Sequence, residues 1–246
     1  VQRGDGSPLS ALSPCNSMHA DGFVYRLKVG AASAFIIFYI LTLITARSGA
    51  MSKRLEAIMA HIPPHSRGLA DVGTDHGYLP AALYKRGYTG RLIATDINQD
   101  PLGKALRTAE SIGAEDKISL RLCDGLDGVS PGEVDTIVIA GMGGDTICGI
   151  LDRAEWCMAE EYTLILQPMT KCEILRYWLI YNGFEIISEE LVRDERLYQI
   201  ITARFGGCGI LNDAELYTGS FALIGKDPLF PELLIKLKRR FSSAVS

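Results

Sequence analysis

The chain has 246 residues, an apolar content of 48 % and a formal net charge of −4. It is therefore long and apolar enough to bury a sizeable core, and it lacks the positive excess of general nucleic-acid coat proteins, although a local basic patch is not excluded. Its six cysteines are scattered without a C-x-x-C pair, so we expect reduced thiols in a cytoplasmic protein and no metal site.

The first fifty residues share no pattern with the rest of the chain. Residues 1–28 are rich in Gly, Ser and Pro and are predicted to be disordered. Residues 29–46 form an uncharged apolar run that is just long enough for a transmembrane helix. The run is a signal anchor, an apolar helix lying on the domain, or a segment outside a natural product that begins at Met51. We favour the third interpretation, and expect membrane contact only if the run is an anchor.

From Met51 to residue 206, helical and strand patterns alternate. Helices are predicted over residues 52–61, 78–86, 101–112, 145–154 and 171–182. An apolar run at residue 68 starts the first strand, and further strands are predicted over residues 90–97, 118–125, 134–140 and 162–168. Such alternation predicts a parallel sheet covered on both faces, with a ligand beyond the carboxyl ends of its strands.

The pattern changes after residue 183. Two strands, over residues 184–192 and 197–205, are joined by a short polar turn and predict an antiparallel hairpin. Five alternating units followed by a hairpin are typical of methyltransferases that use S-adenosylmethionine, whereas a nicotinamide dehydrogenase more often continues with another α/β unit. Residues 207–246 form a short C-terminal segment, with parts of helices near residues 217–224 and 233–237.

A glycine loop follows the first strand. It reads Asp71-x-Gly73-x-Asp75-x-Gly77 and does not fit the dinucleotide fingerprint G-x-G-x-x-G. Asp75 stands where the middle glycine of that fingerprint would be, so it would repel a diphosphate but suits a ligand with an amino group and a positive sulfur. The alternative is a structural turn with acids at a helix N-terminus. His76 is a candidate general base or a packing residue.

Acidic residues also end the next two strands. A carboxylate at Asp96 can accept both ribose hydroxyls of an adenosine ligand, and this does not distinguish NAD from S-adenosylmethionine. Asp124, within Cys123-Asp124-Gly125, can accept a hydrogen bond from adenine N6. For both acids the alternative is an ordinary role in a turn.

Two further strand ends complete the predicted rim, by which we mean the loops at the carboxyl ends of the five parallel strands. The glycines of residues 141–144 either let a flat base approach the backbone or turn the chain, and they are expected to end the fourth strand. Gln167, before Pro168, either offers its side-chain amide to a substrate or ends the fifth strand.

These motifs together resemble the bacterial tRNA (adenine(22)-N1)-methyltransferase family. The resemblance rests on residues 71–80, 124–126, 140–144, 166–168 and 176–179, and it covers the chain from Met51 to about Phe205. It implies an α/β, Rossmann-like class I methyltransferase fold, with a seven-stranded, mostly parallel sheet that ends in an antiparallel hairpin. It also implies S-adenosylmethionine as the methyl donor and N1 of adenine 22 in tRNA as the acceptor. Residues 1–50 have no counterpart in the family, and the C-terminal helical segment is shorter than the family's helical hairpin.

The resemblance assigns the candidate site residues. The donor site is expected to comprise Asp71, Gly73, Asp75, His76, Tyr78, Leu79, Asp96, Ile97, Cys123, Asp124, Gly125, Ala140, Gly141, Met142 and Gly143. The tRNA is expected to contact Gly144, Gln167, Pro168, Lys171 and Arg176. Asp75 is the first candidate for stabilising the cationic product ring, and His76 the second.

Three other functions remain open from the sequence. The chain could be a methyltransferase of small molecules, tethered to a membrane through residues 29–46, or an NAD-dependent oxidoreductase. A non-catalytic RNA-binding relative is the third. No obligate protein partner is evident.

Overall fold

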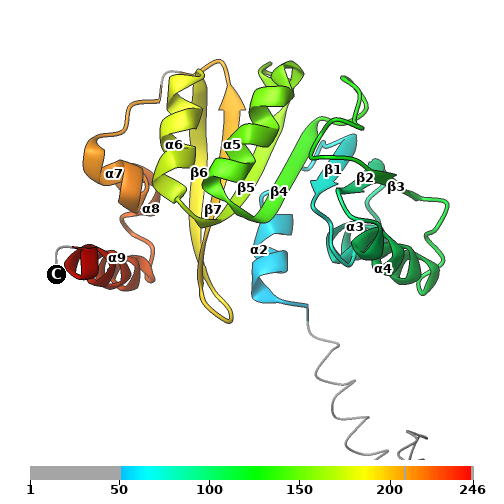
Figure 1. Ribbon diagram of the computed structural model, residues 1–246, viewed down its shortest axis with the longest axis horizontal. Coiled ribbons are helices and arrows are strands. Elements are labelled where there is room, and N and C mark those ends of the chain that lie inside the picture. Colours follow the sequence, from blue (N-terminus) through cyan, green and yellow to red (C-terminus); the bar gives the residue numbers. More distant parts are fainter. Residues whose placement is uncertain (1–50, 208, 245–246) are drawn as a thin grey trace, which may run out of the picture. The chain divides into compact units, whose positions relative to one another are not determined.

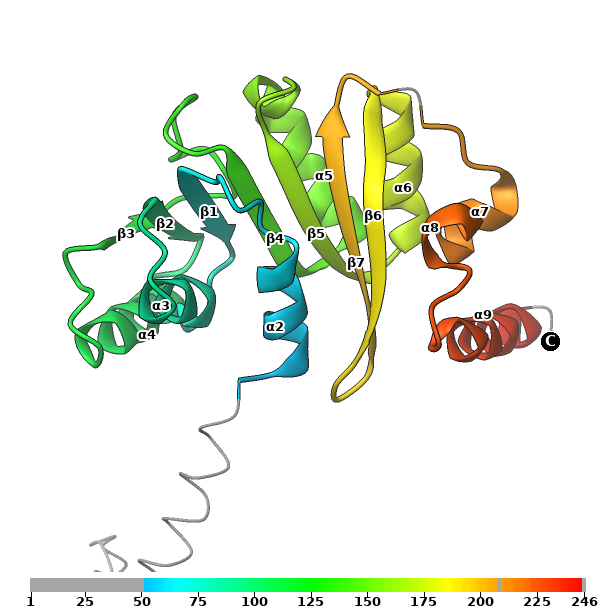
Figure 2. The ribbon, with the colours of Figure 1, turned by 180° about the vertical axis from the view of Figure 1, so that it is seen from behind.

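The computed structural model describes residues 51–207 and 209–244 (Figures 1 and 2). The predicted extension of residues 1–50, with its apolar run at 29–46, lies outside the described residues. Its three interpretations and the boundary at Met51 therefore stay predictions. Within the two described ranges, no helix has both the length and the apolar character needed to span a membrane.

A seven-stranded sheet forms the centre of the domain, in the order β3-β2-β1-β4-β5-β7-β6 (Figure 1). The first five of these strands pair in parallel, whereas β7 runs antiparallel to both β5 and β6. The strands are β1 (Gly68–Val72), β2 (Arg91–Asp96), β3 (Ile118–Leu122), β4 (Thr136–Gly143), β5 (Thr163–Thr170), β6 (Phe184–Arg193) and β7 (Leu197–Phe205). The predicted parallel sheet with a terminal hairpin is confirmed.

A helix precedes β1, helices connect the parallel strands except β3 and β4, and further helices follow the hairpin. They are α2 (Lys53–Ala60), α3 (Tyr78–Lys85), α4 (Gln99–Glu110), α5 (Gly144–Arg153), α6 (Cys172–Tyr181), α7 (Asp213–Thr218), α8 (Phe221–Ile224) and α9 (Phe230–Ala244), with a short 3₁₀ turn, η1 (Glu155–Cys157). The first five agree closely with the helices that the apolar spacing predicts.

Apolar side chains cover both faces of the sheet. On β4, Val138 packs in a cluster with α2 and α3, whereas its neighbours Ile137 and Ile139 pack in a cluster with α5 and α6. In Figure 1 α5 and α6 lie in front of the sheet, and in Figure 2 β6 and β7 lie in front of α6. Because successive residues of a strand point to opposite faces and both faces are buried here, the central strand β4 is apolar without a break from Ile137 to Ala140, whereas the edge strand β3 carries Ser119 and Arg121.

Strand β4 is longer than predicted. Its glycines were expected to end it after Ala140, but the strand continues to Gly143, and α5 begins at Gly144. The pairing with β5 is irregular between Ala140 and Met142, where Gly141 has a φ of +84°. A bulged residue with positive φ is easily formed by glycine, so the glycines bend the strand instead of ending it. Met142 therefore lies in the last part of strand β4 and not in a loop.

The C-terminal segment packs against the hairpin. Leu191 and Leu197 of the hairpin form a small buried cluster with Ile224 of α8 and Leu233 of α9. The helix predicted around residues 217–224 is divided in two at Gly219, whose φ is +88°. These helices are thus fixed to the sheet by buried apolar contacts.

Candidate active site

The loops after β1, β2 and β3 are tied together by hydrogen bonds at the carboxyl ends of the strands. The backbone N–H groups of Gly73 and Thr74 donate to the carbonyl oxygen of Thr95, at 2.8 and 2.9 Å. The Thr95 hydroxyl in turn donates to the carbonyl oxygen of Gly125 at 2.8 Å. Cys123 N–H donates to the carbonyl oxygen of Asp96 at 3.0 Å. The predicted donor-site residues of these three loops are therefore brought together on one rim.

The rim continues to β4 through a close contact. Gly73 has a φ of +71°, and a Cβ placed on it would lie 2.2 Å from Cε of Met142. The positive φ favours glycine, and the Met142 methyl group occupies the space that a Cβ would take. The predicted sites in the glycine loop and in the segment from Ala140 to Gly143 are thus neighbours in space.

Asp71 is a buried carboxyl at the end of β1, and only 7 % of the residue is exposed. Burial raises its pKa to about 6, against the lowering effect of a hydrogen bond from the Thr74 hydroxyl. That hydrogen bond is 2.5 Å long. The positive charge of Arg54 also lowers the pKa, and the nearby Asp96 raises it. Asp71 is therefore a charge held inside the rim, mostly ionised at neutral pH.

Asp75 and His76 stand on the outer side of the glycine loop. Oδ2 of Asp75 lies 3.6 Å from Nε2 of His76, and their side chains are 66 % and 35 % exposed. The His76 ring stacks on the ring of Tyr78, with centroids 5.1 Å apart and planes 2° from parallel. Asp75 keeps a φ of 50°, which Asp and Asn tolerate better than most residues. The two catalytic candidates are accessible to a substrate, whereas the adjacent Leu79 is buried.

The acids after β2 and β3 differ in their partners. Asp96 is partly exposed and accepts a hydrogen bond from the backbone N–H of Asn98 at 2.9 Å, beside the exposed Ile97. Asp124 forms an ion pair with Arg153, whose Nη2 lies 2.9 Å from Oδ1. One oxygen of each acid thus already has a partner, and only Asp124 is paired with a positive charge.

Arg54 is a rim residue that the sequence analysis missed. Its Nη1 donates to Oε1 of Gln167 at 3.1 Å, and its guanidinium lies 5.2 Å from the centroid of the Tyr198 ring. Nη1 also lies 3.7 Å from the place of a Cβ on Gly141. Arg54 reaches the rim because α2 packs on one face of the sheet. No local sequence pattern predicts this contact between Arg54 and Gln167.

Two of the predicted tRNA contacts, Arg176 and Gln167, are buried side chains in the structure. Arg176 is fully buried, and its Nε donates to Oε1 of Glu189 at 2.7 Å. Gln167 is also fully buried, and its amide donates to the carbonyl oxygen of Pro168 at 3.0 Å. Neither side chain has an atom free for a substrate. The position of Arg176 in an amphipathic helix does not reveal this, because its acid partner lies on the hairpin.

The other predicted tRNA contacts differ in accessibility. Gly144 and Pro168 are buried at the ends of β4 and β5. Lys171 is exposed before α6, and its Nζ lies 2.6 Å from Oδ2 of Asp145. Of the five residues assigned to tRNA, Lys171 alone presents a charged side chain to solvent.

The charges of the rim favour one kind of ligand. Asp75, Asp96 and Asp124 stand at the ends of three neighbouring strands and Asp71 is buried beneath them, so a diphosphate would be repelled while a ligand with an ammonium or sulfonium charge is attracted. Asp96 offers an acceptor for ribose hydroxyls. In the part of the chain that the structure describes, no group of three His, Cys, Asp or Glu side chains could hold a metal ion.

The chain is similar in sequence and in fold to known methyltransferases. A family model described as "Methyltransferase domain" matches residues 51–201. The tRNA (adenine(22)-N(1))-methyltransferase of Bacillus subtilis is 33 % identical over 186 residues, which cover 73 % of this chain and 78 % of that protein. The crystal structure of the B. subtilis m1A22 tRNA methyltransferase TrmK superposes with a TM-score of 0.73 at 31 % identity, covering 79 % of this chain and 86 % of that one. A Streptococcus pneumoniae protein in complex with S-adenosyl-L-methionine superposes with a TM-score of 0.72 at 31 % identity, covering 79 % and 91 %.

Proposed function

This chain belongs to the tRNA (adenine(22)-N1)-methyltransferase family, and from this premise we propose that it methylates N1 of adenine 22 in tRNA with S-adenosylmethionine as the donor. The observation that carries the proposal is the 33 % identity to the B. subtilis enzyme across 78 % of that enzyme's length. The acidic rim supports the choice of donor over a dinucleotide.

The rim residues hold the donor in this proposal. When bound, S-adenosylmethionine supplies an electrophilic methyl group on a positively charged sulfur. Asp96 accepts hydrogen bonds from the ribose hydroxyls, and the backbone at Gly73 allows a close approach. Asp71 and Asp75 contribute negative charge that favours a cationic ligand, and Met142 borders the site across from Gly73. The nonpolar Leu79 and Ile97, with Cys123 and Gly125, complete the wall.

The acceptor nitrogen needs little activation. N1 of adenine carries a lone pair in the plane of the ring, so the enzyme mainly has to align the base, an effect worth several kcal/mol. Methylation leaves a positive charge on the ring, and the accessible carboxylate of Asp75 is placed to stabilise it. His76, 3.6 Å from Asp75, orients that carboxylate in this scheme and remains the second candidate. The target base leaves its stack to reach the rim.

The same proposal sets the cellular context. The partner is a tRNA substrate, and a cytoplasmic location follows from the presence of tRNA there. Lys171 is the one remaining side chain, among those first assigned to tRNA, that can meet a phosphate.

A transfer assay tests the function. The full chain is incubated with methyl-labelled S-adenosylmethionine and a tRNA transcript that carries adenine at position 22, and the nucleosides are then separated. We expect labelled 1-methyladenosine, and none from the transcript with guanine at position 22. Label that enters small metabolites but not tRNA would refute the proposal in favour of a small-molecule methyltransferase. Binding of NAD in preference to S-adenosylhomocysteine would refute it in favour of an oxidoreductase.

A further inference from the structure

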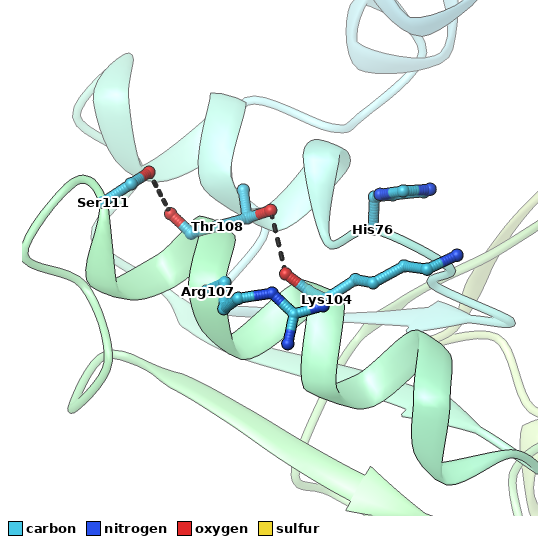
Figure 3. Close-up of a pocket in the computed structure, with 5 residues that line it drawn as sticks. All are labelled: His76, Lys104, Arg107, Thr108 and Ser111. Atoms are coloured by element: carbon cyan, nitrogen blue, oxygen red, sulfur yellow. Dashed lines mark hydrogen bonds between the residues drawn. The ribbon is translucent and has the colours of Figure 1, made fainter. Parts of the chain in front are cut away.

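A groove of about 460 Å³ lies next to the glycine loop, outside the acidic rim (Figure 3). It is lined by His76 and by four residues of α4 and its C-terminal end, Lys104, Arg107, Thr108 and Ser111. Figure 3 shows the His76 ring on one side and the side chains from α4 on the other. His76 belongs both to the groove and to the loop of the candidate active site, so the two are continuous.

The charge of the groove is positive, in contrast to the rim. Lys104 is partly buried, while Arg107 extends back along α4, with Nη1 3.8 Å from the place of a Cβ on Gly103. The two cations therefore lie along the same stretch of the helix (Figure 3). Among the ion pairs of the described residues, none includes Lys104 or Arg107. Their charges are therefore available to an anion.

The hydroxyl groups of the groove are placed as acceptors. Thr108 donates its hydroxyl proton to the carbonyl oxygen of Lys104 at 3.1 Å, and Ser111 donates to the carbonyl oxygen of Thr108 at 2.7 Å. Each oxygen keeps lone pairs for an incoming donor such as a ribose 2′-hydroxyl. Two cations beside two hydroxyl acceptors match the alternating phosphate and ribose groups of an RNA backbone.

Close packing between α4 and the start of α3 holds the groove beside the glycine loop. A Cβ on Gly77 would lie 2.9 Å from Cβ of Ala105, so α4 packs directly against the start of α3. His76, which lines the groove, stacks on Tyr78 of α3 with ring centroids 5.1 Å apart, so both rings lie where the groove meets the glycine loop. A strand of RNA whose phosphates lie in the groove would thus pass these rings on its way to the rim.

We propose that the groove formed by Lys104, Arg107, Thr108, Ser111 and His76 binds the sugar–phosphate backbone of the tRNA strand that carries the target adenine. The inference rests on the proposed function, and it adds a binding site on α4. Lys104 and Arg107 neutralise phosphates, Thr108 and Ser111 accept from ribose hydroxyls, and the base next along the strand is directed toward Asp75.

The test compares two double variants of the full chain. Lys104→Ala/Arg107→Ala removes two charges from the groove. Arg67→Ala/Lys226→Ala removes two exposed charges, one from the segment before β1 and one from the segment after α8, which packs against β6 at the edge of the sheet far from β3. The Kd for the tRNA transcript is measured by fluorescence anisotropy at several salt concentrations. The Kd for S-adenosylhomocysteine is measured by calorimetry, and it also reports whether each variant is folded.

We expect the groove variant to raise the tRNA Kd roughly tenfold and to reduce the salt slope by about 2, because two phosphate contacts are lost. The control variant should change the tRNA Kd by less than about twofold, since exposed charges far from the ligand are screened. Both variants should bind S-adenosylhomocysteine as the unmodified chain does.

Three results would overturn the inference. Equal tRNA affinity and salt slope in the two double variants would show that the groove has no special part in binding. Weaker S-adenosylhomocysteine binding in the groove variant, with tRNA binding intact, would assign the groove to the methyl donor. If the unmodified chain neither binds nor methylates the transcript, the proposed function fails, and the inference falls with it.

Discussion

Replacement of Arg176 by Met should destabilise the domain and not impair tRNA binding directly. The Arg176 guanidinium is completely enclosed and fully hydrogen-bonded. Its Nε donates to Glu189, its Nη2 to Oε1 of Gln199 at 2.8 Å and its Nη1 to the carbonyl oxygen of Leu216 at 2.9 Å. The second oxygen of Glu189 accepts from the backbone N–H of Ser220 at 2.6 Å. The buried arginine thus connects α6, the hairpin and α7, and its partner Glu189 extends the network to the segment after α7.

The expected cost follows from what the substitution leaves behind. Met fills a similar volume, but it leaves the Glu189 carboxylate buried with the Ser220 N–H as its remaining donor. Breaking a buried ion pair from one side costs about 3–5 kcal/mol. Since domains of this kind are stable by about 5–15 kcal/mol, the substitution removes a large share of the free energy of unfolding. Replacing both partners, as Arg176→Met/Glu189→Gln, removes the unpaired charge and should recover part of the loss.

Urea unfolding followed by circular dichroism measures this free energy. The matched control is Arg86→Met, because Arg86 pairs with Glu56 and the two side chains are 56 % and 52 % exposed. An exposed pair contributes at most about 1 kcal/mol, so the control should unfold near the midpoint of the unmodified chain. The reasoning is refuted if Arg176→Met unfolds like the control, or if the folded Arg176→Met loses tRNA affinity without losing stability.

Three further substitutions test the rim. Asp71→Asn should remove a pH dependence of the free energy of unfolding. The folded pKa of Asp71 is about 6, above the usual 3.8, so its carboxyl group contributes its full stability below pH 3.8. That stability, about 3 kcal/mol in all, is lost as the pH rises through 6. Equal slopes of stability against pH in both proteins, measured by urea unfolding between pH 4 and 7, would contradict this. Asp75→Asn, which keeps the φ of 50°, should lower kcat for tRNA methylation by about 100-fold with S-adenosylhomocysteine affinity unchanged; full activity would exclude the carboxylate as a stabiliser of the product charge. Gly73→Ala should cost about 1–2 kcal/mol of stability, because the φ of +71° is unfavourable for a residue with a side chain. It should also weaken S-adenosylhomocysteine binding, because the new Cβ would enter the space of Met142. Gly73→Ala/Met142→Ala should therefore regain part of that binding in calorimetry. No recovery in the double variant would show that the steric contact is not the cause.

The fold could be predicted because its signals are local. Apolar spacing defines the helices, and Gly or Pro marks where they end, so α2 to α6 lie where the periodicity places them. Parallel strands follow from the alternation of elements, and the common rim follows from the parallel sheet. The acids Asp71, Asp96 and Asp124 could be assigned to one edge without coordinates for this reason.

The parts that could not be predicted depend on contacts between distant segments. Arg176 is a charged residue near a helix start, and nothing within a few residues of it shows that Glu189 will meet it inside the core. Arg54 reaches Gln167 because α2 crosses the end of β5, 113 residues further along the chain. Gly141 is a residue type that often ends a strand, yet its neighbours Ala140 and Met142 pair with β5 and keep β4 continuous. In each case tertiary packing decides between two locally reasonable interpretations.

The distribution of charge could not be predicted from the net charge either, because the two substrates of the proposed reaction have opposite charges. The methyl donor is a cation at the reacting sulfur and tRNA is a polyanion, so one uniform surface potential cannot favour both. The fold separates the two requirements: the acids stand at the strand ends, whereas Lys104 and Arg107 stand on the adjacent helix α4. The net charge of −4 is the sum over both regions. It would argue against nucleic-acid binding only if the charge were spread evenly over the surface. Since phosphate contacts on α4 would be local and few, tRNA binding should weaken with salt, while binding of the donor inside the rim should change much less.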